Sequence, residues 1–164
     1  MPGPRNPIST DGNSYNLFNI TTVVGDEAGS PSIVAELRKH TPDGVLLTNF
    51  DVPLAGPPSV TALTPTSAVT LDANTTYWLI LGVLGGAGSF GWSYAEGDNF
   101  VGPGALSSYA YSANQGISWD LSGNVGNPYK MSVNVDVATV PEPSTLASGA
   151  AALLVALAFR LRRY

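Results

Sequence analysis

The chain has 164 residues, with seven Lys or Arg against twelve Asp or Glu, and no cysteine. This length leaves room for one domain with a hydrophobic core. The lack of cysteine excludes disulfides and cysteine-ligated metals. The acidic balance argues against nucleic acid as a partner, because nucleic-acid binding depends on cationic contacts to phosphate.

The composition is typical of a turn-rich β protein with a neutral polar surface. Charged residues make up only 12% of the chain, which contains 18 Gly and 13 Pro. Residues 1–143 hold all twelve acidic side chains and four of the seven basic ones, a net charge of −8. A body with this charge is not expected to adhere to anionic lipid by electrostatic attraction.

Residues 1–30 are predicted to form a loop-rich entry with one short strand at residues 15–24 and a turn at residues 26–31. Residues 1–10 lack the apolar core that a secretory signal requires. Because the export inferred below needs such a signal, we expect a further segment upstream of Met1.

The strongest hairpin signal lies at residues 33–50. Residues 33–39 alternate as a strand, Thr41–Gly44 reads Thr-Pro-Asp-Gly, and residues 45–50 return. We expect Gly44 to supply a positive φ in this turn. Further short strands are predicted at residues 59–63 and 68–71.

Residues 76–84 are apolar on both faces and therefore predict a central strand. The last strand, residues 130–137, alternates: Met131, Val133, Val135 and Val137 are expected to point inward, and Ser132, Asn134 and Asp136 outward. Three more strands are predicted at residues 89–94, 106–112 and 117–120.

These strands together define the expected fold class. About nine strands with regular turns, and no amphipathic helix before residue 144, predict an all-β protein. We expect an antiparallel β-sandwich or jelly-roll-like domain over residues 31–138, with its start possible near residue 15. A tail at residues 139–164 follows this domain.

Candidate catalytic and metal-binding groups are sparse. His40 is the only histidine, so a zinc site or a histidine-based triad has little support. A glycosidase pair needs two carboxylates about 5–10 Å apart, and nothing in the sequence selects Glu36 with Glu96 or Asp98. The pairs Asp26-Glu27 and Asp98-Asn99 could bind calcium in loops through oxygen ligands, although no calcium-loop pattern is present. We expect no catalytic residue, no metal and no cofactor.

The aromatic residues are more informative. Trp78 lies in the expected central strand and is predicted to be a core residue. Trp92, Tyr94, Tyr109 and Tyr111 lie on or beside later strands, where exposed rings could stack on sugars. These four are the candidates for glycan contact.

The tail contains an uncharged segment that is apolar on every face. Residues 144–161 would form about 27 Å of helix, against a hydrocarbon thickness of about 30 Å. Pro141 and Pro143 prevent the helix from starting earlier. We therefore expect a single C-terminal transmembrane helix at residues 144–161.

The orientation of that helix follows from three arginines at its end, Arg160, Arg162 and Arg163. Basic flanks stay in the cytoplasm, and no Lys or Arg lies within ten residues of the other flank. The domain ahead of Pro141 is therefore expected outside the cytoplasm, with the arginines as the cytoplasmic stop.

The motif Pro141, Glu142, Pro143, followed by the apolar span and the basic terminus, resembles the PEP-CTERM sorting signal of Gram-negative bacteria. The resemblance implies a substrate of exosortase, a membrane-embedded, transpeptidase-like enzyme thought to cut near the Pro-Glu-Pro motif. It implies an inner-membrane anchor first, and the cell surface or the extracellular space afterwards. Residues 15–138 more loosely resemble the choice-of-anchor β domains that accompany such tails, which have no assigned catalytic residues.

The functional hypotheses fall into three classes. The first is an exported, non-enzymatic surface or matrix protein that exosortase sorts. The second is a carbohydrate-binding, lectin-like module of the extracellular polysaccharide matrix. The third is a glycan-active enzyme, which a single essential carboxylate would reveal.

Overall fold

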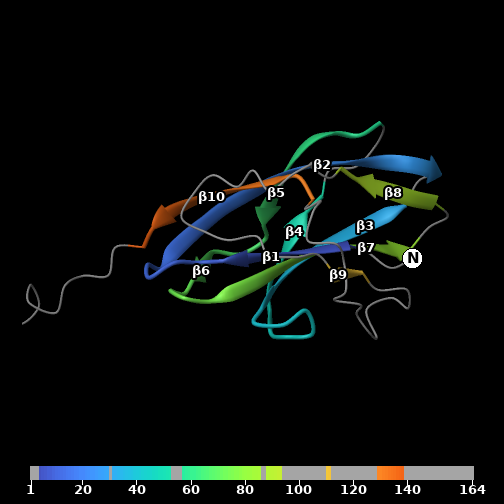
Figure 1. Cartoon of the computed structure of the whole chain (residues 1–164). Coiled ribbons are helices and arrows are strands. Elements are labelled where there is room, and N and C mark those ends of the chain that lie inside the picture. The colour runs from blue at the N-terminus through green and yellow to red at the C-terminus, as the bar shows by residue number, and fades with distance from the viewer. Residues whose placement is uncertain are drawn as a thin grey trace, which may run out of the picture.

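The computed structural model describes residues 4–29, 31–52, 57–85, 88–93, 110–111 and 129–138, and all the regular structure in these ranges is β (Figure 1). The strands are β1 (Pro4–Ser9), β2 (Tyr15–Gly29), β3 (Ser32–Lys39), β4 (Leu46–Asp51), β5 (Ser59–Pro65), β6 (Val69–Leu71), β7 (Thr76–Gly85), β8 (Gly88–Trp92), β9 (Ala110–Tyr111) and β10 (Met131–Val137).

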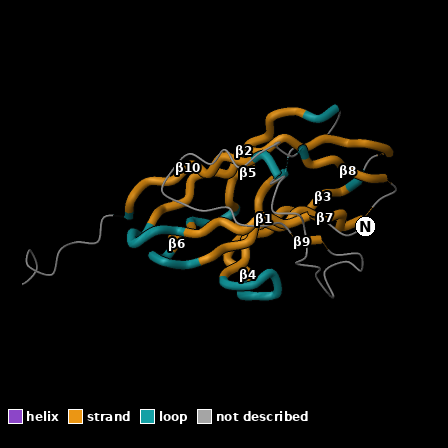
Figure 2. Tube along the Cα trace, viewed as in Figure 1, coloured by secondary structure: helices purple, strands orange, loops and turns teal. Residues whose placement is uncertain are grey.

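These strands pair in the order β10-β2-β5-β4-β3-β7-β1-β9, with β6 and β8 also paired to β2. Every pairing is antiparallel. Strand β5 joins the two halves, because Leu63 pairs with Ile20 of β2 while Pro65 pairs with Phe50 of β4. The described strands therefore form one curled antiparallel sheet, which confirms the predicted all-β class (Figures 1 and 2).

Strand β2 is the longest and has neighbours along both edges. One edge pairs with β6 and β5, and the other with β10 and then β8. The N-terminal region is therefore not a loop-rich entry with one short strand. Strand β1 was missed because Pro4 and Pro7 argue against a strand. The predicted turn at residues 26–31 was wrong over residues 26–29, which continue β2 and pair with β8 through a bulge at Glu27.

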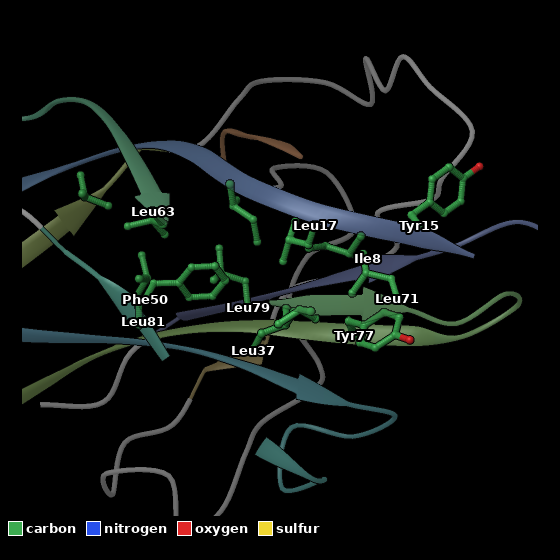
Figure 3. Packing of buried hydrophobic residues seen from close by; sticks show 14 of the residues in the cluster. Ile8, Tyr15, Leu17, Leu37, Phe50, Leu63, Leu71, Tyr77, Leu79 and Leu81 are labelled. Atoms are coloured by element: carbon green, nitrogen blue, oxygen red, sulfur yellow. The ribbon is translucent and has the colours of Figure 1, made fainter. Parts of the chain in front are cut away.

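The curled sheet encloses one hydrophobic core. Side chains alternate along the strands, so the core receives Leu17 and Leu63 from one half of the sheet and Leu37 and Leu79 from the other (Figure 3). Strand β7 lies between β3 and β1 and directs Tyr77, Leu79 and Leu81 into this core. Its opposite face carries a second buried pair, Trp78 and Ile80. The predictions of a central strand and of a buried Trp78 are confirmed.

The β3–β4 hairpin is also confirmed, but the reason for its glycine differs from the prediction. The residue with positive φ is His40, at 68°, and not Gly44. A Cβ atom on Gly44 would collide with the carbonyl oxygen of Lys39. The N–H of Lys39 donates to Val45 O at 2.9 Å, which holds the two backbones close together. Gly44 is thus needed for the close approach of two backbones.

The last strand follows its predicted pattern except at its end. Met131, Val133 and Val135 pack against the core, and Ser132, Asn134 and Asp136 are exposed. Val137 was predicted to point inward, yet it is 56% exposed. It is the last residue of β10 and is not among the side chains that pack against the core, so alternation does not lead to burial at the end of this strand.

Candidate sorting tail and its exit from the domain

The predicted sorting residues lie in the tail, which follows Ala138, the last residue that the structure describes. Pro141, Glu142, Pro143, Arg160, Arg162, Arg163 and the predicted helix at residues 144–161 all lie outside the described residues. In the part of the chain that the structure describes, no helix has the length and apolarity needed to cross a bilayer.

Ala138, the last described residue, is held to the start of the N-terminal half of the sheet. Val137 pairs with Tyr15 at the start of β2, and Ala138 N–H donates to Ser14 O at 2.8 Å. Pro141 follows three residues later, a reach of at most about 10 Å. Any enzyme that reads the Pro-Glu-Pro motif must therefore work close to the folded domain.

The turn that holds Ala138 is organised by Asp11. Its carboxylate accepts hydrogen bonds from Asn13 N–H and from the Tyr15 hydroxyl, both at 2.8 Å. The bond from Asn13 N–H, followed by that from Tyr15, lowers the pKa of Asp11. The same carboxylate, with burial, raises the pKa of Tyr15. This turn is thus held in one conformation when Asp11 is ionised and Tyr15 is protonated.

A second turn, between β6 and β7, is bonded to the first. Asn74 N–H donates to Asp11 O at 2.6 Å and Thr10 N–H to Thr75 O at 3.0 Å. Asn74 takes a φ of 51°, a conformation that asparagine tolerates better than most residues. The two turns therefore form a single hydrogen-bonded unit.

The β3–β4 turn joins the same end of the domain. His40 N–H donates to Thr76 O at 2.8 Å, and the Lys39 ammonium pairs with the Asp72 carboxylate at 2.6 Å. The hydrogen bond to Asp72 raises the pKa of Lys39. We call Ala138 and the turns at residues 10–14, 40–45 and 72–75 the exit end. Figure 2 shows two of its turns in teal beside the end of β10 and the β3–β4 turn below them.

Of the predicted glycan-contact residues, the side chain of Trp92 alone is described. It is 6% exposed and stacks on Tyr129, with ring centroids 4.5 Å apart and planes at 22°. Its indole N–H donates to Lys130 O at 3.4 Å. Burial leaves the ring little face for a sugar, so this structure does not favour Trp92 as a glycan contact. Tyr94 and Tyr109 lie outside the described residues, and only the backbone of Tyr111 is described, in β9.

Within the described ranges, no three His, Asp or Glu side chains gather as metal ligands. Glu36 pairs with Arg38 at 2.8 Å, and its suggested partners Glu96 and Asp98 lie outside the description. Residues 26–27 lie on β2 and not in a loop, so the loop geometry imagined for calcium is absent there.

Comparison with known proteins identifies the tail. The family described as PEP-CTERM protein-sorting motif matches residues 139–163. No curated protein and no solved structure matches the chain. The match supports the sorting signal and implies export, recognition by the membrane enzyme exosortase and delivery to the surface of a Gram-negative bacterium. It does not extend to residues 15–138, so the resemblance to choice-of-anchor domains stays an expectation.

Sequence reasoning found the tail but missed the exit end. The residues that it overlooked are Asp11, Ser14 and Tyr15, which hold the last residue that the structure describes before the motif. The signal was present as Asp11-Gly12-Asn13, a turn sequence in which an aspartate side chain bonds the backbone two residues on.

Proposed function

We propose that this chain is an exported, non-enzymatic β protein that is first anchored by residues 144–161 and then processed by exosortase near Pro141. The observation that carries the proposal is the sorting-motif match at residues 139–163. In this scheme Arg160, Arg162 and Arg163 halt translocation, because guanidinium groups are costly to move across a bilayer. The mature domain then reaches the cell surface or the extracellular polysaccharide matrix.

The structure supports a domain that folds separately from the tail that carries the sorting signal. The described part is a curled β sheet around one core. Ala138, which follows its last strand, is hydrogen-bonded to Ser14, and the motif begins three residues later. A body that folds before processing remains intact when the tail is cut. In this scheme the tail is the sorting signal, and the domain is the part that is exported.

The experiment is pulse-chase processing in the native host. Replacing Pro141, Glu142 and Pro143 by alanine should leave an unprocessed, membrane-bound form, whereas replacing the exposed Pro57 by alanine should not. Equal processing of both variants would overturn the sorting role of the motif.

A lectin-like role is a second candidate, and a different surface favours it. The outward face of β2 and β10 presents amide and hydroxyl side chains, including Asn16, Asn19 and Asn134, around Phe18, which is 48% exposed. Phe18 is the extra residue of a bulge, since Leu17 pairs with Val135 and Asn19 with Asn134. A bulge changes the direction in which a side chain points. An exposed aromatic ring beside amide groups, with the Asp136 carboxylate opposite Asn16, offers a stacking surface for a sugar.

A further inference from the structure

We propose that the exit end docks on the extracytoplasmic lipid surface of the bilayer that anchors the tail, through the exposed side chains of Val45, Leu46 and Val137. This inference rests on the proposed function, because it needs residues 144–161 to be inserted. It goes beyond that function by assigning a lipid-contacting surface to the folded domain.

The first observation is where the exposed hydrophobic side chains lie. Among the described residues, the large exposed hydrophobics are Phe18, Val45, Leu46, Val60 and Val137. Val137 ends β10 beside Tyr15, while Val45 and Leu46 follow the β3–β4 turn. Their exposed fractions are 69% for Val45, 41% for Leu46 and 56% for Val137. Single exposed hydrophobics are ordinary, and these three matter here because the exit end that carries them is the described part of the domain nearest to the tail.

The second observation is the length of chain between the domain and the predicted span. Ala138 is held to Ser14, and Ser144, where the apolar segment begins, is six residues further on. Six residues reach at most about 20 Å. The headgroup layer takes about 5–7 Å of that distance. The exit end is therefore confined close to the lipid surface for as long as the tail is intact.

The charges of the exit end favour apolar contact over electrostatic attraction. The Lys39 ammonium is paired with Asp72, and the Asp11 carboxylate is engaged by Asn13 and Tyr15. The exit end also carries Asp43 in the β3–β4 turn and has Asp136 next to Val137, both exposed, so it offers no excess of basic side chains to anionic headgroups. Docking should therefore depend on side-chain insertion and should persist at high salt.

Docking by three aliphatic side chains is weak by itself. It requires the tether, by which we mean residues 139–143 and the inserted segment that follows them. A short link to the membrane keeps the local concentration of lipid surface high, which makes a weak contact persistent. Cleavage near Pro141 removes the tether and releases the domain. The exit end would thus hold the motif at the membrane until processing and would not retain the product afterwards.

The test uses the full chain in proteoliposomes of a neutral phospholipid with a minority of anionic lipid. Because the chain has no cysteine, Leu46→Cys, Val137→Cys and the control Val60→Cys each carry one label. Val60 is 74% exposed but pairs with Val23, eight residues along β2 from Tyr15. The readout is quenching of an environment-sensitive fluorophore by nitroxide placed at a shallow depth in the lipid.

We expect labels at residues 46 and 137 to lose about half of their emission, since interfacial side chains insert about 5–10 Å, and the label at residue 60 to lose none. Unquenched labels at 46 and 137 on a chain that has inserted would overturn the docking and leave the proposed function intact. Equal quenching at all three positions would also overturn it, because the domain would then lie flat. A chain that does not insert at all overturns the anchoring and the docking together.

Discussion

Leu63 offers a stringent test of the single curled sheet, because it lies on the strand that joins the two halves. Its side chain is fully buried, and its residue pairs with Ile20 of β2. Leu63→Ala removes three buried carbons at about 0.8 kcal/mol each, and the cavity left behind adds to this. We expect a loss of about 3 kcal/mol in the free energy of unfolding, within the range of about 2–5 kcal/mol for such sites.

The assay is urea unfolding of the full chain in mild detergent, followed by far-UV circular dichroism and by tryptophan fluorescence. One sheet around one core predicts a single transition by both probes, shifted to lower urea with an unchanged slope. Thr64→Ala, an exposed neighbour on the same strand, is the matched control and should shift stability by less than about 0.5 kcal/mol. Two separated transitions, or a loss below about 1 kcal/mol for Leu63→Ala, would refute the shared core.

Three further predictions concern the turns and the outward face. Gly44→Ala should destabilise the domain by about 1–3 kcal/mol through its collision with a carbonyl oxygen, whereas Gly12→Ala, with nothing within 4 Å, should be neutral in the same urea assay. Because the pKa of Asp11 is lowered in the folded state, its contribution to the free energy of unfolding is present above the ordinary aspartate pKa of about 3.9 and is lost as the pH falls through the lower folded pKa. Because the pKa of Tyr15 is raised, its contribution is present below the ordinary tyrosine pKa of about 10 and is lost as the pH rises through the higher folded pKa. Asp11→Asn should therefore reduce the fall in the free energy of unfolding at acid pH. An unchanged fall would show that Asp11 does not contribute. Phe18→Ala should abolish any retention on a neutral polysaccharide column, with Val60→Ala as the control, and equal retention of both would remove this face from consideration.

The elements that sequence reasoning predicted share strong local signals. Strand β7 is apolar on both faces, and the β3–β4 hairpin combines alternation with a Thr-Pro-Asp-Gly turn. The tail was identified because three features occur in order, and the family match covers the same residues. In each case the information lies within a short stretch of chain.

The missed features depend on pairings between distant residues. Strand β1 is stabilised by β7, about seventy residues away, and this pairing overrides its two prolines. Residues 26–29 are turn-like in composition but extend β2 because β8 pairs with them. Val137 keeps the alternation of β10 yet is exposed. Local propensity contains none of this information, because tertiary pairing decides these positions.

The most direct measurement is the intact mass of the mature protein isolated from its native host. Exosortase processing predicts a chain that ends near Pro141 to Ser144 and lacks the arginines at 160, 162 and 163. A mature cell-surface protein that still ends at Tyr164 would contradict the sorting function.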